Sequence, residues 1–154
     1  MKLNQWTMGL LLLTAAASTA RAQERRIRRA DLPAAVRKTA DAQSQGATVR
    51  GYSRETENGQ VTYEVEMTVH GRGRDLSIAL DGTIVLIEAE VPFDSLASAV
   101  RAGLTAKAGA GTITKVEALT KHGVLVAYEA QVRTGKKRSE VQVGPKGEPL
   151  DHEE

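Results

Sequence analysis

The chain has 154 residues, with 21 Lys and Arg against 19 Asp and Glu, and it contains no Cys. The absence of Cys excludes disulfides and thiolate metal sites. Aromatic residues make up only 3% of the sequence. Nucleic-acid binders that stack bases need exposed aromatic side chains, so no nucleic-acid partner is expected.

The N-terminus has the pattern of a secretory signal. Lys2 precedes an apolar stretch from Trp6 to Ala17, and Ala20-Arg21-Ala22 follows with the small residues that signal peptidase requires. The apolar stretch is too short to span about 30 Å of hydrocarbon at 1.5 Å per residue. We therefore expect residues 1–22 to be a signal peptide, no transmembrane segment after its cleavage, and a periplasmic or extracellular location.

Removal of the signal changes the charge of the chain. Lys2 and Arg21 leave with it, so 19 cationic and 19 acidic side chains remain. The sequence pI of about 9.0 therefore does not indicate a nucleic-acid binder. Two basic clusters stand out, Arg25–Arg29 within an expected linker (23–30) and Lys136-Lys137-Arg138 in an expected turn. They are interpreted as solvated segments or, alternatively, as surfaces attracted to an anionic envelope or an acidic partner.

The rest of the chain shows weak internal similarity. The sequence from Leu32 to Arg37 matches that from Leu96 to Arg101 at an offset of 64, and Tyr63-Glu64 matches Tyr128-Glu129 at an offset of 65. Order and spacing of helix, turn and strand signals agree between the two stretches. This pattern predicts two tandem copies, residues 31–91 and 92–154.

Each copy should begin with an amphipathic helix. In the first copy, apolar residues recur at helical spacing, with Asp31 as the expected N-cap. In the second copy, Asp94 or Ser95 is the expected cap. The two apolar stripes consist of Leu32, Ala35, Val36, Thr39 and Ala40, and of Leu96, Ala99, Val100, Gly103 and Leu104.

The remainder of each copy should form strands. Residues 61–69 alternate apolar and polar side chains, which is typical of a sheet with one face in water. Asn58-Gly59 and Asp81-Gly82 are typical hairpin turns. The second copy should end with a short or missing strand, because Pro149 and polar residues replace the apolar strand at 84–88. The predicted fold class is α+β, with two tandem repeats that each pack one helix on an antiparallel sheet of about four strands.

These motifs resemble the PepSY and PepSY-like modules, a group that includes relatives named for their likeness to β-lactamase inhibitor proteins. The resemblance is carried by Leu32-Pro33-Ala34-Ala35-Val36, Tyr63-Glu64-Val65-Glu66 and Asp81-Gly82. It implies an inhibitory or regulatory binding domain of the cell envelope without catalytic residues. The second copy departs from the pattern at Ala97, where the first has Pro33.

The sequence contains no recognisable catalytic constellation. His70, His122 and His152 are far apart and lack metal-ligand spacing. Glu64 and Glu66 are expected on an exposed strand face, where they would titrate as ordinary acids. We therefore expect no enzyme activity, no catalytic residue, no metal site and no cofactor.

Two functional hypotheses remain. The first is a module that binds a protein partner, such as a secreted protease or other hydrolase that it inhibits or regulates. The second is a sensory or structural envelope protein that binds a small ligand or ion, or forms a homodimer through its sheet edge. The candidate partner-binding residues are Thr62, Glu64, Glu66, Thr68, Glu129, Gln131, Arg133, Val141 and Val143.

Overall fold

A computed structural model describes residues 23–57 and 59–154. The predicted signal peptide, 1–22, and Asn58 of the predicted first hairpin turn lie outside the described residues. Two short 3-10 helices, η1 (Arg29–Asp31) and η2 (Phe93–Ser95), precede the two α-helices. The remaining elements, in chain order, are β1 (Gln23–Ile27), α1 (Ala34–Gln43), β2 (Thr48–Glu57), β3 (Gln60–Val69), β4 (Arg72–Ala79), β5 (Ile84–Glu90), α2 (Ser98–Ala108), β6 (Thr112–Lys121), β7 (Val124–Thr134) and β8 (Lys137–Val143).

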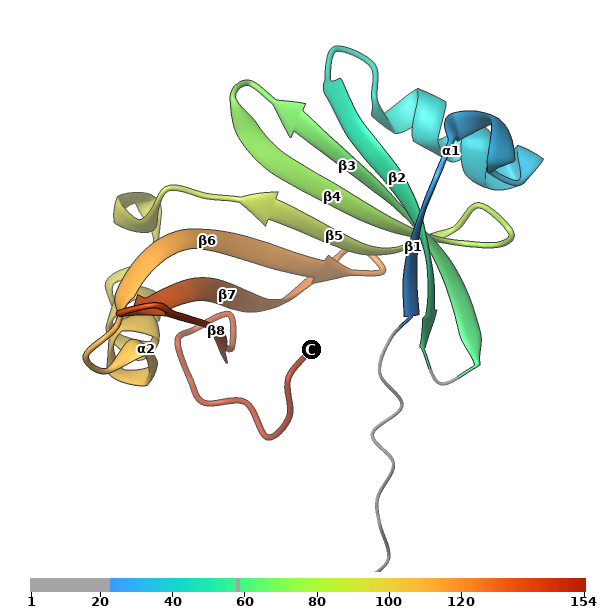
Figure 1. Cartoon of the computed structure of the whole chain (residues 1–154). Helices are drawn as coiled ribbons and strands as arrows, with labels where there is room; N and C mark the ends of the chain where they lie inside the picture. The colour runs from blue at the N-terminus through green and yellow to red at the C-terminus, as the bar shows by residue number, and fades with distance from the viewer. Residues whose placement is uncertain (1–22, 58) are drawn as a thin grey trace, which may run out of the picture.

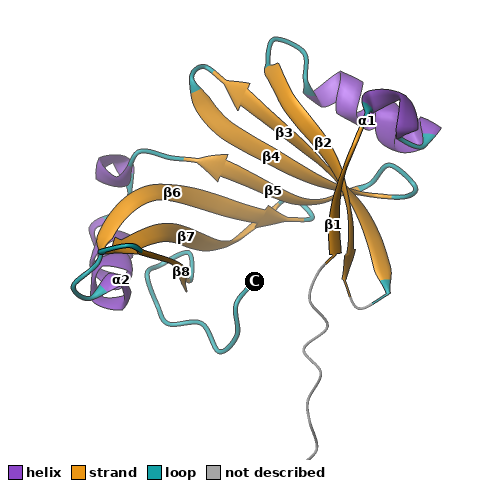
Figure 2. Cartoon of the chain, viewed as in Figure 1, coloured by secondary structure: helices purple, strands orange, loops and turns teal. Residues whose placement is uncertain are grey.

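The strands form one antiparallel sheet in the order β1 to β8, so each strand pairs with its neighbours in the sequence. Figures 1 and 2 show this sheet with the two short helices near its opposite ends. The predicted fold class is therefore wrong. The chain is mostly one eight-stranded sheet rather than two tandem helix-on-sheet repeats.

The physical reason lies at the junction of β5 and β6. Leu86 to Glu90 pair with Lys121 to Glu117, which places Glu88 opposite Leu119. Had the two halves formed separate sheets, both strands would have been edges with unpaired backbone groups, a costly and aggregation-prone arrangement. Pairing removes both edges and merges the halves.

Each helix covers its own hydrophobic cluster on the same side of the sheet. Val36 and Ala40 of α1 are buried with residues of β3 and β4, such as Val65 and Leu76. Val100 and Leu104 of α2 are buried with residues of β6, β7 and β8. The Thr39 hydroxyl also donates a hydrogen bond of 2.7 Å to the Gly82 carbonyl, which ties α1 to the β4–β5 turn.

The segment predicted as a basic linker is largely a strand. β1 pairs along its length with β2, and Arg26 lies opposite Ser53. Its cationic residues alternate across the sheet because successive side chains of a strand point to opposite faces. The prediction of a linker rested on the run of charged residues and did not consider that this segment could pair as a strand.

The predicted helix caps are also wrong. α1 begins after Pro33 and α2 after Ala97, and neither residue makes a side-chain capping bond. Asp31 instead belongs to η1, where its carboxylate accepts hydrogen bonds from the backbone and side chain of Arg28. Asp94 and Ser95 lie in η2.

No strand follows β8 in the described residues. Residues 144–154, all of them described, contain turns but no strand, so β8 is an edge strand. Asp81-Gly82 forms a turn as predicted, and His122-Gly123 forms another, with Gly82 and Gly123 at positive φ. Within the described part of the chain, no helix is both long and apolar enough to cross a membrane.

The continuous sheet predicts that both halves unfold together. Leu104→Ala should lower the free energy of unfolding by about 2–5 kcal/mol, because the Leu104 side chain of α2 is fully buried against the sheet. Residues of β3 and β7 should nevertheless lose structure at the same urea concentration, as followed by NMR of backbone amides.

The matched control is Leu80→Ala, because the Leu80 side chain is 61% exposed. That substitution should change the free energy of unfolding by less than about 0.5 kcal/mol. Two separate transitions in Leu104→Ala, one for each half, would contradict a single cooperative sheet.

Candidate functional site: the open face of the sheet

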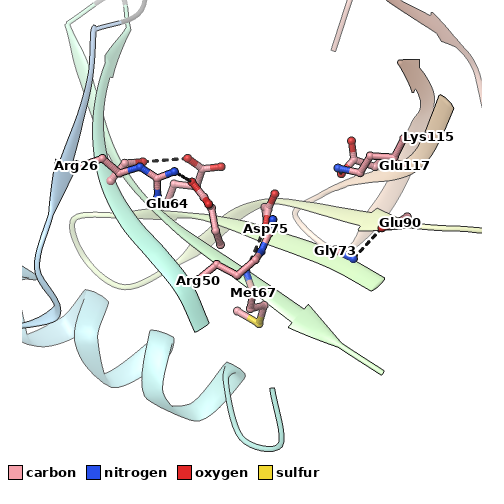
Figure 3. Close-up of polar contacts among 11 residues, drawn as sticks. Arg26, Arg50, Glu64, Met67, Gly73, Asp75, Glu90, Lys115 and Glu117 are labelled. Carbon is pink, nitrogen blue, oxygen red and sulfur yellow. Dashed lines mark hydrogen bonds and ion pairs between the residues drawn. The ribbon is translucent and has the colours of Figure 1, made fainter. Parts of the chain in front are cut away.

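The side of the sheet that neither α-helix covers is here called the open face. Side chains alternate between the two sides of a strand. On β3, Val65 and Met67 are buried on the helix side, so Glu64, Glu66 and Thr68 lie on the open face. Figure 3 shows Glu64, Asp75 and Glu117 on the opposite side of the sheet from helix α1, whereas Met67 points toward it. The open face is therefore the polar surface of the sheet.

Carboxylates of β1 and β3 cluster at one end of this face. Oxygens of Glu24, Glu64 and Glu66 lie within 4.8 Å of one another, an arrangement that could hold a cation. Arg26 already supplies a positive charge there, with its guanidinium 2.7 Å from Glu66 (Figure 3). Ser53 donates a hydrogen bond of 2.9 Å to Glu64. Protein groups thus compensate much of the charge in this cluster.

Asp75 on β4 continues the acidic surface toward the centre of the sheet. It lies opposite Glu66 on β3 and opposite Glu88 on β5. The Arg50 guanidinium donates a hydrogen bond of 2.8 Å to its carboxylate (Figure 3). The backbone N–H of Met67 donates a longer one of 3.3 Å.

A row of three glutamates crosses β5, β6 and β7. Glu90 lies opposite Glu117, and Glu117 lies opposite Glu129. Like charges in directly opposed positions destabilise a sheet unless other groups compensate. Here the Gly73 N–H donates to Glu90, Lys115 Nζ lies 2.5 Å from Glu117, and the Gln142 amide donates to Glu129 at 2.8 Å.

Glu88 differs from these neighbours because it has no compensating partner. Among residues 23–57 and 59–154, no side chain or backbone group forms a hydrogen bond or ion pair with its carboxylate. Partial burial, together with the charges of Glu117, Glu129, Glu64 and Asp75, raises its pKa to about 7. Glu88 therefore carries the least compensated carboxylate at the centre of the open face.

Burial also raises the pKa of Glu64 and of Glu129. Hydrogen bonds from Ser53 and from Gln142 oppose the shift in each case. The prediction that Glu64 titrates as an ordinary exposed acid is therefore wrong, because neighbouring strands remove much of its water.

The predicted binding residues fall on both sides of the sheet. Thr62, Glu64, Glu66 and Thr68 share the open face of β3, and register places Glu129, Gln131 and Arg133 on the open face of β7. The two groups are separated by β4, β5 and β6.

Val141 and Val143 do not belong with them. Val143 is 1% exposed and lies in the cluster under α2, and Val141 packs against the same cluster. Sequence reasoning also missed Asp75, Glu88, Glu90 and Glu117. The alternation in Glu88-Ala89-Glu90 and in Lys115-Val116-Glu117 was the available signal for a polar face.

The C-terminal segment crosses the end of the open face near β7 and β8 (Figure 1). The Glu154 backbone N–H donates a hydrogen bond of 2.7 Å to Gln142, and its carboxylate lies 3.0 Å from Lys121 Nζ. The segment therefore covers part of the second half of this face and leaves the Glu64–Glu88 region open.

Comparisons with known proteins find solved structures that share this fold. No protein-family model matches the chain, and no curated protein is similar to it in sequence. A structure from Bacteroides eggerthii, provisionally assigned to the periplasm, is 17% identical with a TM-score of 0.60, over 75% of this chain and 84% of that one. A BLIP-like protein from Bacteroides fragilis is 17% identical with a TM-score of 0.56, over 77% and 83% of the two chains.

A protein of the DUF2874 family from Bacteroides ovatus is 15% identical, with a TM-score of 0.59 over 77% of this chain and 84% of that chain. At these identities the likeness concerns the fold alone. The predicted resemblance to β-lactamase-inhibitor-like proteins is thus supported at the level of the fold, whereas membership in PepSY remains a prediction.

The raised pKa of Glu88 predicts a specific pH dependence of stability. Between pH 4.5 and pH 7 the folded state keeps a proton on Glu88 that the unfolded state releases. Folding stability from this group is thus fully present below pH 4.5 and lost as the pH rises through about 7. Glu88→Gln should remove this loss and raise the free energy of unfolding at pH 8 by about 1–2 kcal/mol, a value reduced for partial solvent exposure.

Urea unfolding at pH 5 and pH 8 measures this difference. Glu140→Gln serves as the control, because it removes the same charge from an exposed position on β8. If Glu88→Gln shows the same pH dependence as the wild type, Glu88 is not the group that titrates.

Proposed function

We propose that the chain is an exported, non-catalytic module that binds a protein partner across the open face of its sheet. The observation that carries this proposal is the composition of that face. Among the described side chains, ten carboxylates on the open face of β1 to β8 stand against six cationic side chains, which gives a formal charge of −4. The carboxylates are Glu24, Glu55, Glu64, Glu66, Asp75, Glu88, Glu90, Glu117, Glu129 and Glu140, and the cationic residues are Arg26, Arg50, Lys115, Lys121, Arg133 and Arg138.

This charge is local rather than a property of the whole chain. Residues 23–154 contain equal numbers of acidic and of Lys and Arg side chains. The cationic side chains must therefore lie mostly elsewhere on the molecule. A partner with cationic groups would complement the open face and gain association rate from electrostatic attraction.

A secreted hydrolase is the first class of partner to test. The fold likeness to a BLIP-like protein motivates an inhibition assay but does not identify the enzyme. A sheet face suits the role because it is rigid, so binding would cost little ordering of the module itself.

Self-association through the sheet edge is the second candidate. The exposed edge strand β8 carries Lys137, Arg138 and Glu140, and charged side chains on an edge oppose strand pairing with another chain. This arrangement favours the face over the edge as the binding surface.

Substitution at the centre of the face tests the proposal. Ser77 lies on β4 between Glu64 and Leu86. Ser77→Arg should place bulk and positive charge on the open face and weaken binding of a partner at least about tenfold. The measurement is capture from envelope extract with residues 23–154 as bait, followed by titration of each captured protein.

Leu80→Arg is the matched control, because it adds the same group at the exposed β4–β5 turn. Circular dichroism checks that both variants are folded. A partner that binds wild type, Ser77→Arg and Leu80→Arg with equal affinity does not use the open face, and the proposal fails.

A further inference from the structure

The turn between β7 and β8 concentrates positive charge without compensation. Arg133, Lys136, Lys137 and Arg138 are all exposed. Throughout the described ranges 23–57 and 59–154, no carboxylate forms an ion pair with any of these four. Four other cations of the open face differ in this respect, because Arg26, Arg50, Lys115 and Lys121 each pair with a carboxylate.

Two of these cations oppose each other directly. Arg133 on β7 and Arg138 on β8 are cross-strand partners. Like charges in such positions destabilise a sheet, and within the described residues no carboxylate forms an ion pair with either arginine. An anion bound between the two guanidinium groups would remove the repulsion.

The same arginines line a hollow in the surface. Its volume is about 630 Å³, and it extends across β6, β7 and β8. The residues that line it also include Thr114, Lys115, Gln131 and Ser139. Glu140 is the one carboxylate among the lining residues. Lys115 is paired with Glu117, so Arg133 and Arg138 against Glu140 leave the hollow formally positive.

We infer that this hollow, at the β8 end of the open face, is a binding site for a phosphate group, a function beyond the proposed binding of a protein partner. Arginine presents its N–H groups in a planar fork that matches two oxygens of a phosphate. Arg133 and Arg138 would bind the phosphate from two adjacent strands.

Titration of the intact chain with inorganic phosphate tests this inference. Amide NMR signals of residues 131–140 should shift in a saturable way with sodium phosphate, and much less with sodium acetate at equal ionic strength. The double variant Arg133→Gln/Arg138→Gln should weaken phosphate binding at least about tenfold. It should remain folded, because both side chains are exposed and their mutual repulsion is removed.

The control is Arg25→Gln/Arg72→Gln, which removes the same charge from exposed residues of β1 and β4 and should leave phosphate affinity unchanged. Vesicles of phosphatidylglycerol, compared with phosphatidylcholine, identify the source of the phosphate. Binding of both inorganic phosphate and phosphatidylglycerol vesicles supports a lipid headgroup, and binding of phosphate alone supports a soluble phosphate ester.

Three outcomes overturn the inference. One is the absence of saturable shifts in residues 131–140, and another is equal phosphate affinity of the wild type and the Arg133/Arg138 variant. The third is a salt-sensitive dimer that only this variant abolishes, without a change in phosphate affinity. That result would mean that the basic turn contacts the acidic face of a second copy.

Discussion

The backbone ladder between β5 and β6 is the interaction on which the rest of the structure depends. It joins the strands that follow α1 to the strands that follow α2, and it places Glu88 opposite Leu119. Without it, each half would present an unpaired edge and a small hydrophobic cluster under one short helix. With it, both clusters lie on one side of a continuous sheet, and the other side becomes an extended polar face.

That polar face has a cost in stability. Carboxylates occupy opposed positions on neighbouring strands, and each requires a compensating group such as Arg26, Arg50 or Lys115. Glu88 lacks such a group, and its pKa rises because its charged form is disfavoured. Residues that are poorly compensated in the free protein are candidates for function, since a partner can supply the missing charge. Arg133 and Arg138 are uncompensated cations, and for them a ligand can supply the missing negative charge.

Local patterns in the sequence predicted the local elements. Alternation in residues 61–69 indicated β3, the helical spacing around Val36 and Val100 indicated α1 and α2, and Asp81-Gly82 indicated a turn. The polar row of Glu64 and Glu66 was also correctly placed on the face that water reaches. These features depend on residues close together in the chain, where periodicity and turn chemistry are informative.

The topology and the centre of the candidate site could not be predicted in the same way. Internal similarity suggested two units, but it carries no information about whether β5 pairs with β6. The surroundings of Glu88 depend on that pairing, because Glu117 and Glu129 lie near Glu88 only when β5 pairs with β6. Val143 was misjudged for a related reason, since its face is set by the position of α2.

Cross-strand NMR contacts between β5 and β6 test this account most directly. The account predicts nuclear Overhauser effects between Glu88 and Leu119 and between Ala89 and Ala118, together with slow amide exchange along both strands. Absence of these contacts, with amides of β5 and β6 exchanging as rapidly as those of exposed edges, would contradict the single sheet and the open face built on it.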